Sequence, residues 1–265
     1  MELLPTGYPP TSMNSAYFER ARPYSRRDWL ATSAAWVSAP VIAGLTGCAS
    51  PPAFVAAPDS VAITPLGVGQ QLRFRVTNLY NGLEVGSAAY RVSSAAIGGP
   101  SRTLEASLPP SNTYRIDGPP RTAQCVLADS TQVSQELFYD VPYVFERPDR
   151  LAPDRLTTGS GPVLHNRYRR NGSSNWLRWD SRVSGLGWER IVLPAGEFLA
   201  LRGSRNIWFD HPEMERKENT RTELLWFAPA LGFWVRREWT GHFFWQGLRR
   251  EREEEDWVRF ELTQA

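Results

Sequence analysis

Three histidines and two cysteines are the residues most able to carry acid–base, nucleophilic or metal chemistry in this chain. The sequence positions of His165, His211 and His242 match neither H-x-x-x-H nor H-E-x-x-H, the spacings that let two imidazoles share one Zn²⁺ ion. The stretch Gly159–Gly161 lacks the G-x-S-x-G spacing of a hydrolase nucleophile, and no phosphate-binding glycine motif is present. The sequence therefore predicts no metal or other cofactor, and it favours a protein that is not an enzyme.

A catalytic site could also be formed by side chains that are distant in sequence and that only the fold brings together. An envelope hydrolase would need convergent carboxylates or a histidine–carboxylate pair. Acidic residues are plentiful, but on a β surface they pair with arginine far more often than they catalyse. An envelope hydrolase therefore stays as the third interpretation, behind two binding roles described below.

The two cysteines, Cys48 and Cys125, lie in different surroundings. Cys125 stands in the apolar stretch T-A-Q-C-V-L-A, which predicts a strand, so we expect a small buried hydrophobe rather than a reactive thiol. Cys48 ends a mildly apolar run that begins at Trp29. If Cys48 has a covalent role of its own, Cys125 has no partner for a disulfide within the chain.

The run from Trp29 to Gly47 is uncharged and rich in small residues. Its 19 residues are close to the minimum for a membrane-spanning helix, and they are diluted by Ser, Thr, Gly and Pro40. A buried amphipathic helix would need polar residues along one face. A weakly apolar, small-residue run behind positive charges near the N-terminus is instead typical of an export signal.

Two short motifs frame this run. The letters S-R-R-D-W-L, which include Arg26 and Arg27, resemble the twin-arginine export signal, with Trp where Phe is common. The letters L-T-G-C, from Leu45 through Gly47 to Cys48, resemble the lipobox of bacterial lipoproteins. That resemblance implies that the cysteine is lipidated and the preceding segment removed. We therefore expect residues 1–47 to be a signal peptide of twin-arginine lipoprotein type.

A lipidated cysteine would make the lipid bilayer a partner of the mature protein. A diacylglyceryl group at Cys48 carries two acyl chains, and two chains make membrane attachment stable where one gives only marginal binding. Ala49 follows the cysteine, whereas an Asp at that position is the inner-membrane retention signal in the enterobacterial lipoprotein family. We therefore predict a periplasm-facing lipoprotein of the cell envelope, with the outer membrane favoured.

The rest of the chain divides into a linker and one domain. Residues 48–66 are rich in Pro, Ala and Ser and predict an extended, flexible tether. Residues 67–265 then form a single β-rich domain of globular composition, since 42% of the whole chain is hydrophobic and 22% is charged. The formal net charge of +2 argues against nucleic acid as a partner.

Hydrophobic residues alternate with polar ones through most of this domain. Leu72, Phe74 and Val76 point one way while the residues between them point the other, and Asn81-Gly82 predicts a type I′ hairpin before the next strand. Turn signals at Gly118-Pro119-Pro120, Asn171-Gly172 and Gly185-Leu186-Gly187 separate later segments. Further strands are expected at 85–92, 122–128, 133–139, 163–169, 176–183, 188–193, 198–209, 220–227, 233–239 and 257–262. The fold class is mainly β: an antiparallel meander that curls into a barrel, half-barrel or sandwich.

Two turn segments carry a family resemblance. L-P-A-G-E-F, from Leu193, and W-F-A-P-A-L-G-F-W-V-R-R-E, from Trp226, resemble segments of a group of uncharacterised bacterial exported proteins. Those proteins show V-P-A-G-x-F and later W-Y-A-P-x-x-G before their last strands. The resemblance spans roughly residues 69–262 and implies a predominantly β fold and an exported location. It supplies no catalytic residues.

Aromatic residues are unusually dense between Trp226 and Trp245. Such side chains can fill the core, or some of them can line an apolar groove or a surface for a partner. For the second role we single out Trp226, Phe233, Trp234 and Trp239. The leading functional hypothesis is a non-catalytic lipoprotein that binds an apolar ligand or an envelope partner, and the alternative is a structural or assembly factor that binds a protein.

Overall fold

The structure is a computed structural model that describes residues 53–109, 121–138, 141–245 and 251–265. This part of the chain contains twelve β-strands and one short 3₁₀ turn, Asp154–Leu156. The strands are β1 (Gln71–Asn78), β2 (Glu84–Ala95), β3 (Arg102–Leu108), β4 (Arg121–Asp129), β5 (Gln132–Phe138), β6 (Val141–Arg150), β7 (Gly159–Arg170), β8 (Leu177–Leu193), β9 (Gly196–Phe209), β10 (Arg216–Ala228), β11 (Phe233–Trp245) and β12 (Glu251–Gln264).

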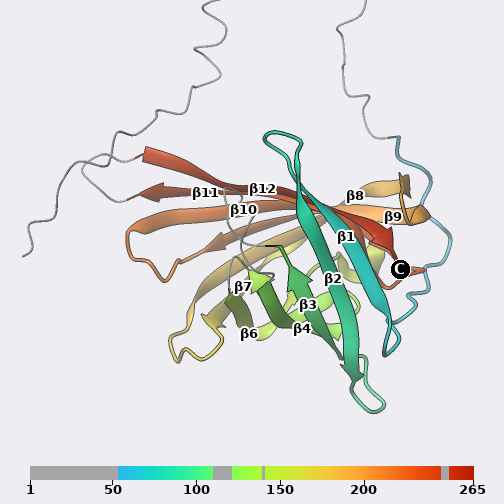
Figure 1. Cartoon of the computed structure of the whole chain (residues 1–265), viewed down its shortest axis with the longest axis horizontal. Helices are drawn as coiled ribbons and strands as arrows, with labels where there is room; N and C mark the ends of the chain where they lie inside the picture. Colours follow the sequence, from blue (N-terminus) through green and yellow to red (C-terminus); the bar gives the residue numbers. More distant parts are fainter. Residues whose placement is uncertain (1–52, 110–120, 139–140, 246–250) are drawn as a thin grey trace, which may run out of the picture. The chain divides into compact units, whose positions relative to one another are not determined.

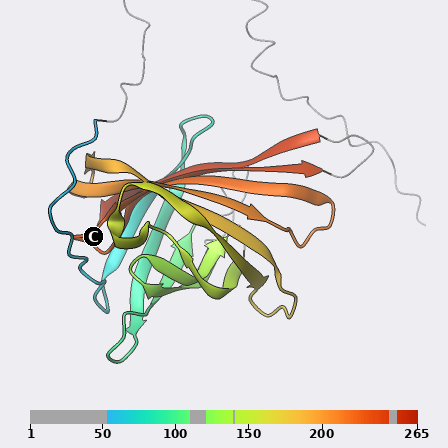
Figure 2. The ribbon, with the colours of Figure 1, turned by 180° about the vertical axis from the view of Figure 1, so that it is seen from behind.

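Every strand pairs with the strands before and after it in sequence, and β1 pairs with β12, so the sheet closes into a barrel (Figure 1). The recorded pairings are antiparallel throughout, from Phe74 opposite Leu262 at the closure to Trp179 opposite Phe209 in the second half. Seen from behind, β10 to β12 lie across from the strands of the first half (Figure 2). The predicted mainly β, antiparallel meander is confirmed, and of the three architectures considered it adopts the barrel.

Two strands, β3 and β6, were not among the expected ones. In β6 the reason is visible in the sequence, since Pro142 and Pro148 weaken the strand signal. The ladder between β6 and β7 is correspondingly short, covering only Tyr143 to Phe145. Beyond it the side chain of Asn166 replaces the ladder: its Nδ2 donates to the Arg147 carbonyl at 2.7 Å and its Oδ1 accepts from the Arg147 N–H at 3.3 Å.

The turn predicted at Gly185-Leu186-Gly187 is wrong, because β8 runs without interruption from Leu177 to Leu193. The register against β9 shifts between Gly185 and Gly187, so the extra residue forms a bulge. Gly185 is needed for a close approach: a Cβ there would lie 2.1 Å from the carbonyl oxygen of Thr157. The glycines therefore admit a neighbouring segment instead of ending a strand.

The hairpin expected at Asn81-Gly82 is present between β1 and β2, but its turn is not type I′. That type needs positive φ at both central residues. Gly82 has a φ of 73°, whereas Asn81 is not among the non-glycine residues with positive φ. The Gly82 N–H donates to the Asn78 carbonyl at 2.8 Å, so the turn is wider than a two-residue loop.

Residues 53–66, part of the predicted tether, touch the barrel at several points. The Val55 N–H donates to the Trp188 carbonyl at 2.8 Å, and the Thr64 N–H donates to the Pro229 carbonyl at 2.9 Å. Gly232, with a φ of 70°, lies under this segment, because a Cβ there would be 1.9 Å from the Thr64 carbonyl oxygen. This part of the segment is therefore held along the ends of β8, β9 and the β10–β11 turn (Figure 1).

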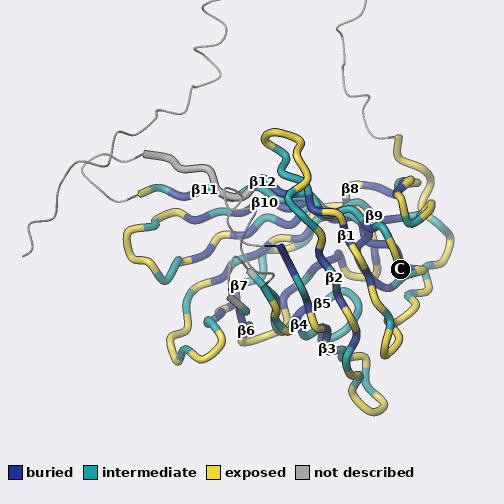
Figure 3. Tube along the Cα trace, viewed as in Figure 1, coloured by how far each residue is buried: buried dark blue, intermediate teal, exposed yellow. Residues whose placement is uncertain are grey.

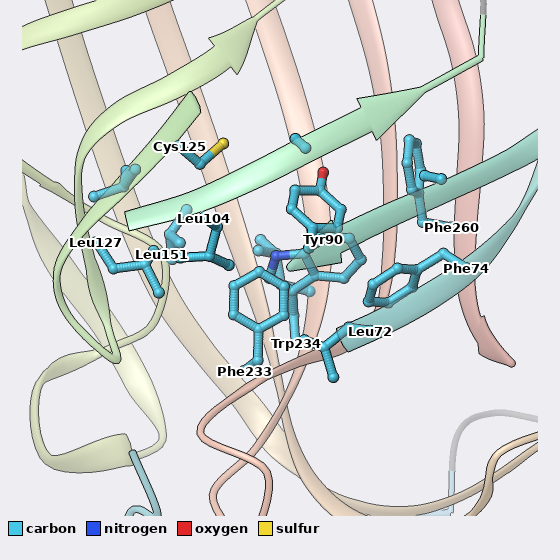
Figure 4. Close-up of a cluster of buried hydrophobic side chains, with 14 of the residues drawn as sticks. Leu72, Phe74, Tyr90, Leu104, Cys125, Leu127, Leu151, Phe233, Trp234 and Phe260 are labelled. Atoms are coloured by element: carbon cyan, nitrogen blue, oxygen red, sulfur yellow. The ribbon is translucent and has the colours of Figure 1, made fainter. Parts of the chain in front are cut away.

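In the described residues, buried side chains alternate with more exposed ones along much of the sheet, as in β1 and most of β8 (Figure 3). One cluster of rings joins β1, β2, β11 and β12 (Figure 4), with Phe74 and Trp234 centroids 4.4 Å apart and Tyr90 edge-on to Trp234 at 5.7 Å. In a smaller cluster, Ala152 and Leu156 from the β6–β7 connection pack on side chains of β8, β9 and β10, and Val61 and Ile63 cover it in part. The strand members are Trp188, Leu201 and Phe227.

Candidate functional site: a buried ionic layer and an outer groove

The residues predicted for export and lipidation lie outside the described part of the chain. They are Arg26, Arg27, Leu45, Gly47 and Cys48. The signal peptide, its cleavage and the lipid anchor therefore stay predictions from the sequence.

Three of the four aromatic residues singled out for a ligand or partner surface lie in the barrel interior. Phe233 and Trp234 are 3% and 2% exposed, and their rings stack with centroids 5.0 Å apart. The partly buried Trp239 stacks on Phe260 at 4.9 Å. These rings pack on one another and on the core. Whether any of them contacts a ligand stays a prediction.

The fourth residue, Trp226, is also buried, at 3% exposed, but its side chain lies on the outer face of β10. Because successive side chains of a strand alternate, Trp226 points away from the face of β10 that carries Glu223 and Leu225. Arg202 and Arg236 cover its ring, at 5.0 and 4.7 Å from the centroid, and its Nε1 donates to Glu189 at 3.0 Å. The four aromatic residues therefore do not form one wall.

The sequence did not reveal the centre of the barrel, where six charged side chains meet. Arg205 is fully buried and donates to Asp149 at 2.6 Å, to Glu136 at 3.1 Å and to Glu223 at 3.2 Å. Arg237 donates to Glu223 at 2.9 Å and also pairs with Glu136. The Arg221 Nε lies 2.7 Å from Glu223. We call these six residues the ionic layer: Glu136, Asp149, Arg205, Arg221, Glu223 and Arg237.

The ionic layer joins walls of the barrel that are distant in sequence. Glu136 and Asp149 come from β5 and β6, and the other four members come from β9, β10 and β11. Three carboxylates and three guanidinium groups balance in formal charge, which lowers the cost of burying each of them. The layer is therefore a set of crosslinks between two halves of the meander.

The pKa values show how strongly these charges depend on one another. Burial alone would raise the pKa of Glu223, but Arg237, Arg221 and Arg205 lower it to about 2. Burial would lower the pKa of Arg205, but the surrounding carboxylates raise it above its usual value. The opposite charges around Glu223 and Arg205 therefore more than offset the effect of burial on both pKa values.

Aromatic rings bound the ionic layer on both sides. On one side the guanidinium of Arg237 lies 5.8 Å from the Trp234 ring centre and 5.4 Å from that of Trp239. On the other side Trp179 donates through Nε1 to Asp149 at 2.8 Å, and the guanidinium of Arg205 lies 5.8 Å from its ring. Further rings pack around Trp179, namely Tyr143, Phe145, Tyr168 and Phe209.

A simple sequence signal points to this layer. In β9, Arg205 lies on the same face of the strand as Ile207 and Phe209. In β10, Glu223 lies on the same face as Leu225. An arginine or glutamate that alternates in step with the apolar residues of a strand is expected on the inward face, and this predicts a buried charge. What the sequence cannot show is which opposite charge each one meets across the barrel.

A groove of about 480 Å³ lies across β1 to β4. One border is a cross-strand row of long polar side chains, in which Arg91 pairs in register with Glu105. Shorter side chains such as Ala89 and Ser107 line the adjoining row. The complete lining is Gln71, Ala89, Tyr90, Arg91, Glu105, Ala106, Ser107, Thr122, Ala123 and Gln124. The lining mixes charged, amide and hydroxyl side chains with alanines, and it contains none of the four predicted aromatic residues.

The histidines lie on different elements. His165 on β7 bonds Asp180 on β8 at 2.9 Å, and this ring is 79% exposed. The His211 side chain is buried, and its pKa is lowered to about 4 by burial and by the nearby Arg216, partly offset by Glu213. His242 lies on β11. A histidine–carboxylate pair is thus present at His165, but in the described part of the chain the ring nitrogens of His165 have no hydroxyl or thiol partner.

Within the described residues, no group of three or more His, Cys, Asp and Glu side chains is arranged to hold a metal ion. Among the same residues no helix has the length and apolar character needed to cross a membrane. Cys125 is a free, buried cysteine, and burial raises the pKa of its thiol to about 12.

No protein-family model matches the chain, and no curated protein matches its sequence. A crystal structure described as an exported protein with a YmcC-like fold, from Bacteroides fragilis, aligns with a TM-score of 0.46 and 15% identity over 77% of this chain and 98% of the other. A crystal structure described as a lipoprotein, from Parabacteroides distasonis, aligns with a TM-score of 0.44 and 12% identity over 78% and 99%. At these TM-scores neither likeness assigns a function to this chain.

Proposed function

We propose that this chain is an exported lipoprotein of the bacterial cell envelope, held to the bilayer by acyl chains on Cys48. The observation that carries the proposal is the order of three sequence features: Arg26 and Arg27, then an uncharged apolar run, then L-T-G-C ending at Cys48. Two acyl chains suffice for stable attachment. Ala49 after the cysteine favours the outer membrane.

The anchor is tested by metabolic labelling with palmitate and by membrane fractionation. The wild-type chain should carry label and sediment with envelope membranes, whereas Cys48→Ala should carry no label and leave the membrane fraction. Replacing Arg26 and Arg27 together by Lys should leave unprocessed precursor in the cytoplasm. An unlabelled wild-type chain, or a Cys48→Ala chain that fractionates unchanged, would remove the proposal.

We further propose that the anchored barrel has a non-catalytic role and binds an envelope protein on its outer surface. The support is the packing of the described part of the barrel interior. A carrier of apolar ligands needs apolar space inside, but here the charges around the fully buried Arg205 occupy the centre, and Trp234 packs against Phe74 at 4.4 Å. The outer groove across β1 to β4 combines amides, hydroxyls and both signs of charge with apolar surface from its alanines, and this mixture is typical of a protein-binding surface.

Photocrosslinking in living cells tests the partner role. A photoreactive residue at Gln124 or Ser107, which line the groove, should trap one defined envelope protein. The same residue at the exposed Thr222 on β10 is the matched control and should not trap it. Equal crosslinking at all three positions would contradict the use of the groove.

Mass spectrometry separates this role from that of an apolar-ligand carrier. The purified acylated protein should contain no lipid other than its own anchor. A stoichiometric co-purified lipid that is lost in Trp234→Ala, with the fold retained by circular dichroism, would replace the partner role with that of a carrier.

A further inference from the structure

An uncharged apolar stretch of the described chain lies exposed where the domain begins. Ala53 to Ala57, A-F-V-A-A, are all exposed, with Phe54 at 47% and Val55 at 37%. Figure 3 shows residues 53–66 as mostly exposed along one end of the barrel. An exposed run of consecutive apolar residues is unusual on a soluble surface and indicates contact with something apolar.

The barrel holds this stretch in a fixed place. Val55 forms a bridge to Trp188 on β8, and the Phe54 ring lies directly on Gly187, where a Cβ would come within 2.4 Å of the ring. Leu186, in the β8 bulge beside Gly187, is itself 42% exposed. We call Ala53–Ala57 together with Leu186 the anchor-side patch.

We propose that the anchor-side patch lies against the lipid bilayer and orients the barrel on the membrane. This inference rests on the proposed lipid anchor at Cys48. Five residues separate Cys48 from Phe54, so their Cα atoms are six residue steps apart and at most about 21 Å from each other in a fully extended chain. An acylated Cys48 sits at the bilayer surface, so the patch cannot leave the neighbourhood of the headgroups.

Chain connectivity also favours the bilayer as what covers the anchor-side patch. A short link to an anchored residue gives the patch a high effective concentration at the membrane, so even a weak interfacial affinity suffices. Aromatic and aliphatic side chains such as Phe54, Val55 and Leu186 are the kind that enter the headgroup region. A second copy of the chain is disfavoured, because a stable dimer buries about 800 Å² on each partner and this patch offers only six residues.

The test uses the acylated protein, purified from membranes and returned to phospholipid vesicles. An environment-sensitive fluorophore is attached to Leu186→Cys or Ala56→Cys. The anchor consumes the Cys48 thiol and Cys125 is buried, so only the introduced cysteine is labelled. Met214→Cys is the matched control, because Met214 is 77% exposed and lies beyond Phe209, the last residue of β9. Leu186 lies beside Gly187, which pairs with Arg202, and the seven residue steps from Arg202 to Phe209 span roughly 23 Å of strand.

The label at residues 186 and 56 should shift its emission to the blue in vesicles and lose intensity when the lipids carry spin-labelled acyl chains. The label at residue 214 should do neither. Equal signals at all three sites would overturn the proposal. So would vesicle-independent protection of residue 186 that grows with protein concentration, which would point to a second copy.

The mass of the purified protein keeps the two proposals separate. An acylated chain with a water-exposed label at residues 186 and 56 refutes the orientation and leaves the anchor intact. A chain without acyl mass refutes the anchor itself, and the introduced label would then share the protein with a free Cys48.

Discussion

Arg205 on β9 donates a 2.6 Å hydrogen bond to Asp149 on β6, and both side chains are fully inaccessible to solvent. The two residues are 56 positions apart in sequence. Asp149 also accepts hydrogen bonds from Trp179 at 2.8 Å and from Ser181 at 2.6 Å. A carboxylate with this many donors and no solvent exposure is expensive to disturb, since any lost partner leaves a charge buried and unpaired.

Asp149→Asn should therefore destabilise the barrel by about 3–5 kcal/mol, the usual cost of breaking a buried ion pair from one side. The substitution keeps the shape of the side chain and removes only its charge, which leaves Arg205 short of one counterion. The midpoint of urea unfolding, followed by tryptophan fluorescence, measures the effect.

The matched control for that variant is Glu197→Gln. Glu197 forms an ion pair with Arg190 at 3.3 Å, but both side chains are more than half exposed. Such surface pairs contribute at most about 1 kcal/mol. If Asp149→Asn and Glu197→Gln shift the unfolding midpoint equally, the ionic layer has no special role in stability.

Stability should fall steeply in acid because of Glu223. Its pKa in the folded barrel is lowered from 4.5 to about 2, so below pH 4.5 the unfolded chain binds a proton that the folded chain does not. The contribution is complete above about pH 4.5 and is lost as the pH falls through 2. Urea unfolding at a series of pH values should show this slope, and Glu223→Gln should flatten it between pH 4.5 and 2.

His211 adds a second, milder slope at higher pH. Its folded pKa is lowered from 6.5 to about 4, so the unfolded state takes up the proton first and stability declines as the pH falls from 6.5 to 4. In the folded state its Nδ1 accepts a hydrogen bond from the Glu213 N–H at 3.1 Å, which requires the neutral ring. His211→Gln keeps an acceptor and should remove this part of the slope; an unchanged slope would show that another group is responsible.

Gly232→Ala should lower the stability of the fold by more than its positive φ alone explains, because the added Cβ would displace residues 61–66 from the barrel. Gly232 and Gly98 both have a φ of 70°, but a Cβ at Gly98 meets nothing within 4 Å, while one at Gly232 meets the Thr64 carbonyl at 1.9 Å. Gly98→Ala should cost about 1–2 kcal/mol from the left-handed conformation. Gly232→Ala should cost clearly more in urea unfolding and should speed proteolysis before residue 66; equal costs would contradict the contact.

Cys125 should resist alkylation in the folded protein. Burial raises its pKa to about 12, although a hydrogen bond from the Leu137 backbone works in the opposite direction. Iodoacetamide at pH 8 should leave the mass of the native chain unchanged at this residue and should modify it fully in urea. Rapid native modification would show that β4 opens easily.

Much of the fold follows from the sequence because period-two alternation is strong in most strands. Leu72, Phe74 and Val76 are all buried, as their spacing predicts, and the β8–β9 and β10–β11 hairpins fall at the two proline-glycine segments. The prediction failed where local signals conflict with tertiary contacts. Pro142 and Pro148 weakened the strand signal of β6, so this strand was not predicted. Gly185 and Gly187 are typical of a turn, but they lie inside β8 and leave space for Thr157 and Phe54.

The site was harder to predict than the strands. Alternation places Arg205 and Glu223 on the inward face, but apart from Arg221 the charged partners of these two residues lie on other strands, up to 69 residues away in the case of Glu136. Such pairings depend on barrel closure and register, which a single sequence does not encode locally. Trp226 shows the same limit: its position among aromatic residues indicates the core, yet its covering groups are the distant Arg202 and the nearby Arg236.

The pairing of β1 with β12 has a consequence for how the protein is made. Arg73 on β1 pairs with Gln264 on β12, nearly two hundred residues later, so the barrel can close only after the ribosome has made β12. Until then the nascent sheet carries two unprotected edges, which invite association with other chains. Loss of the last strand would therefore do more than shorten the protein, because it would fix the chain permanently in that aggregation-prone condition.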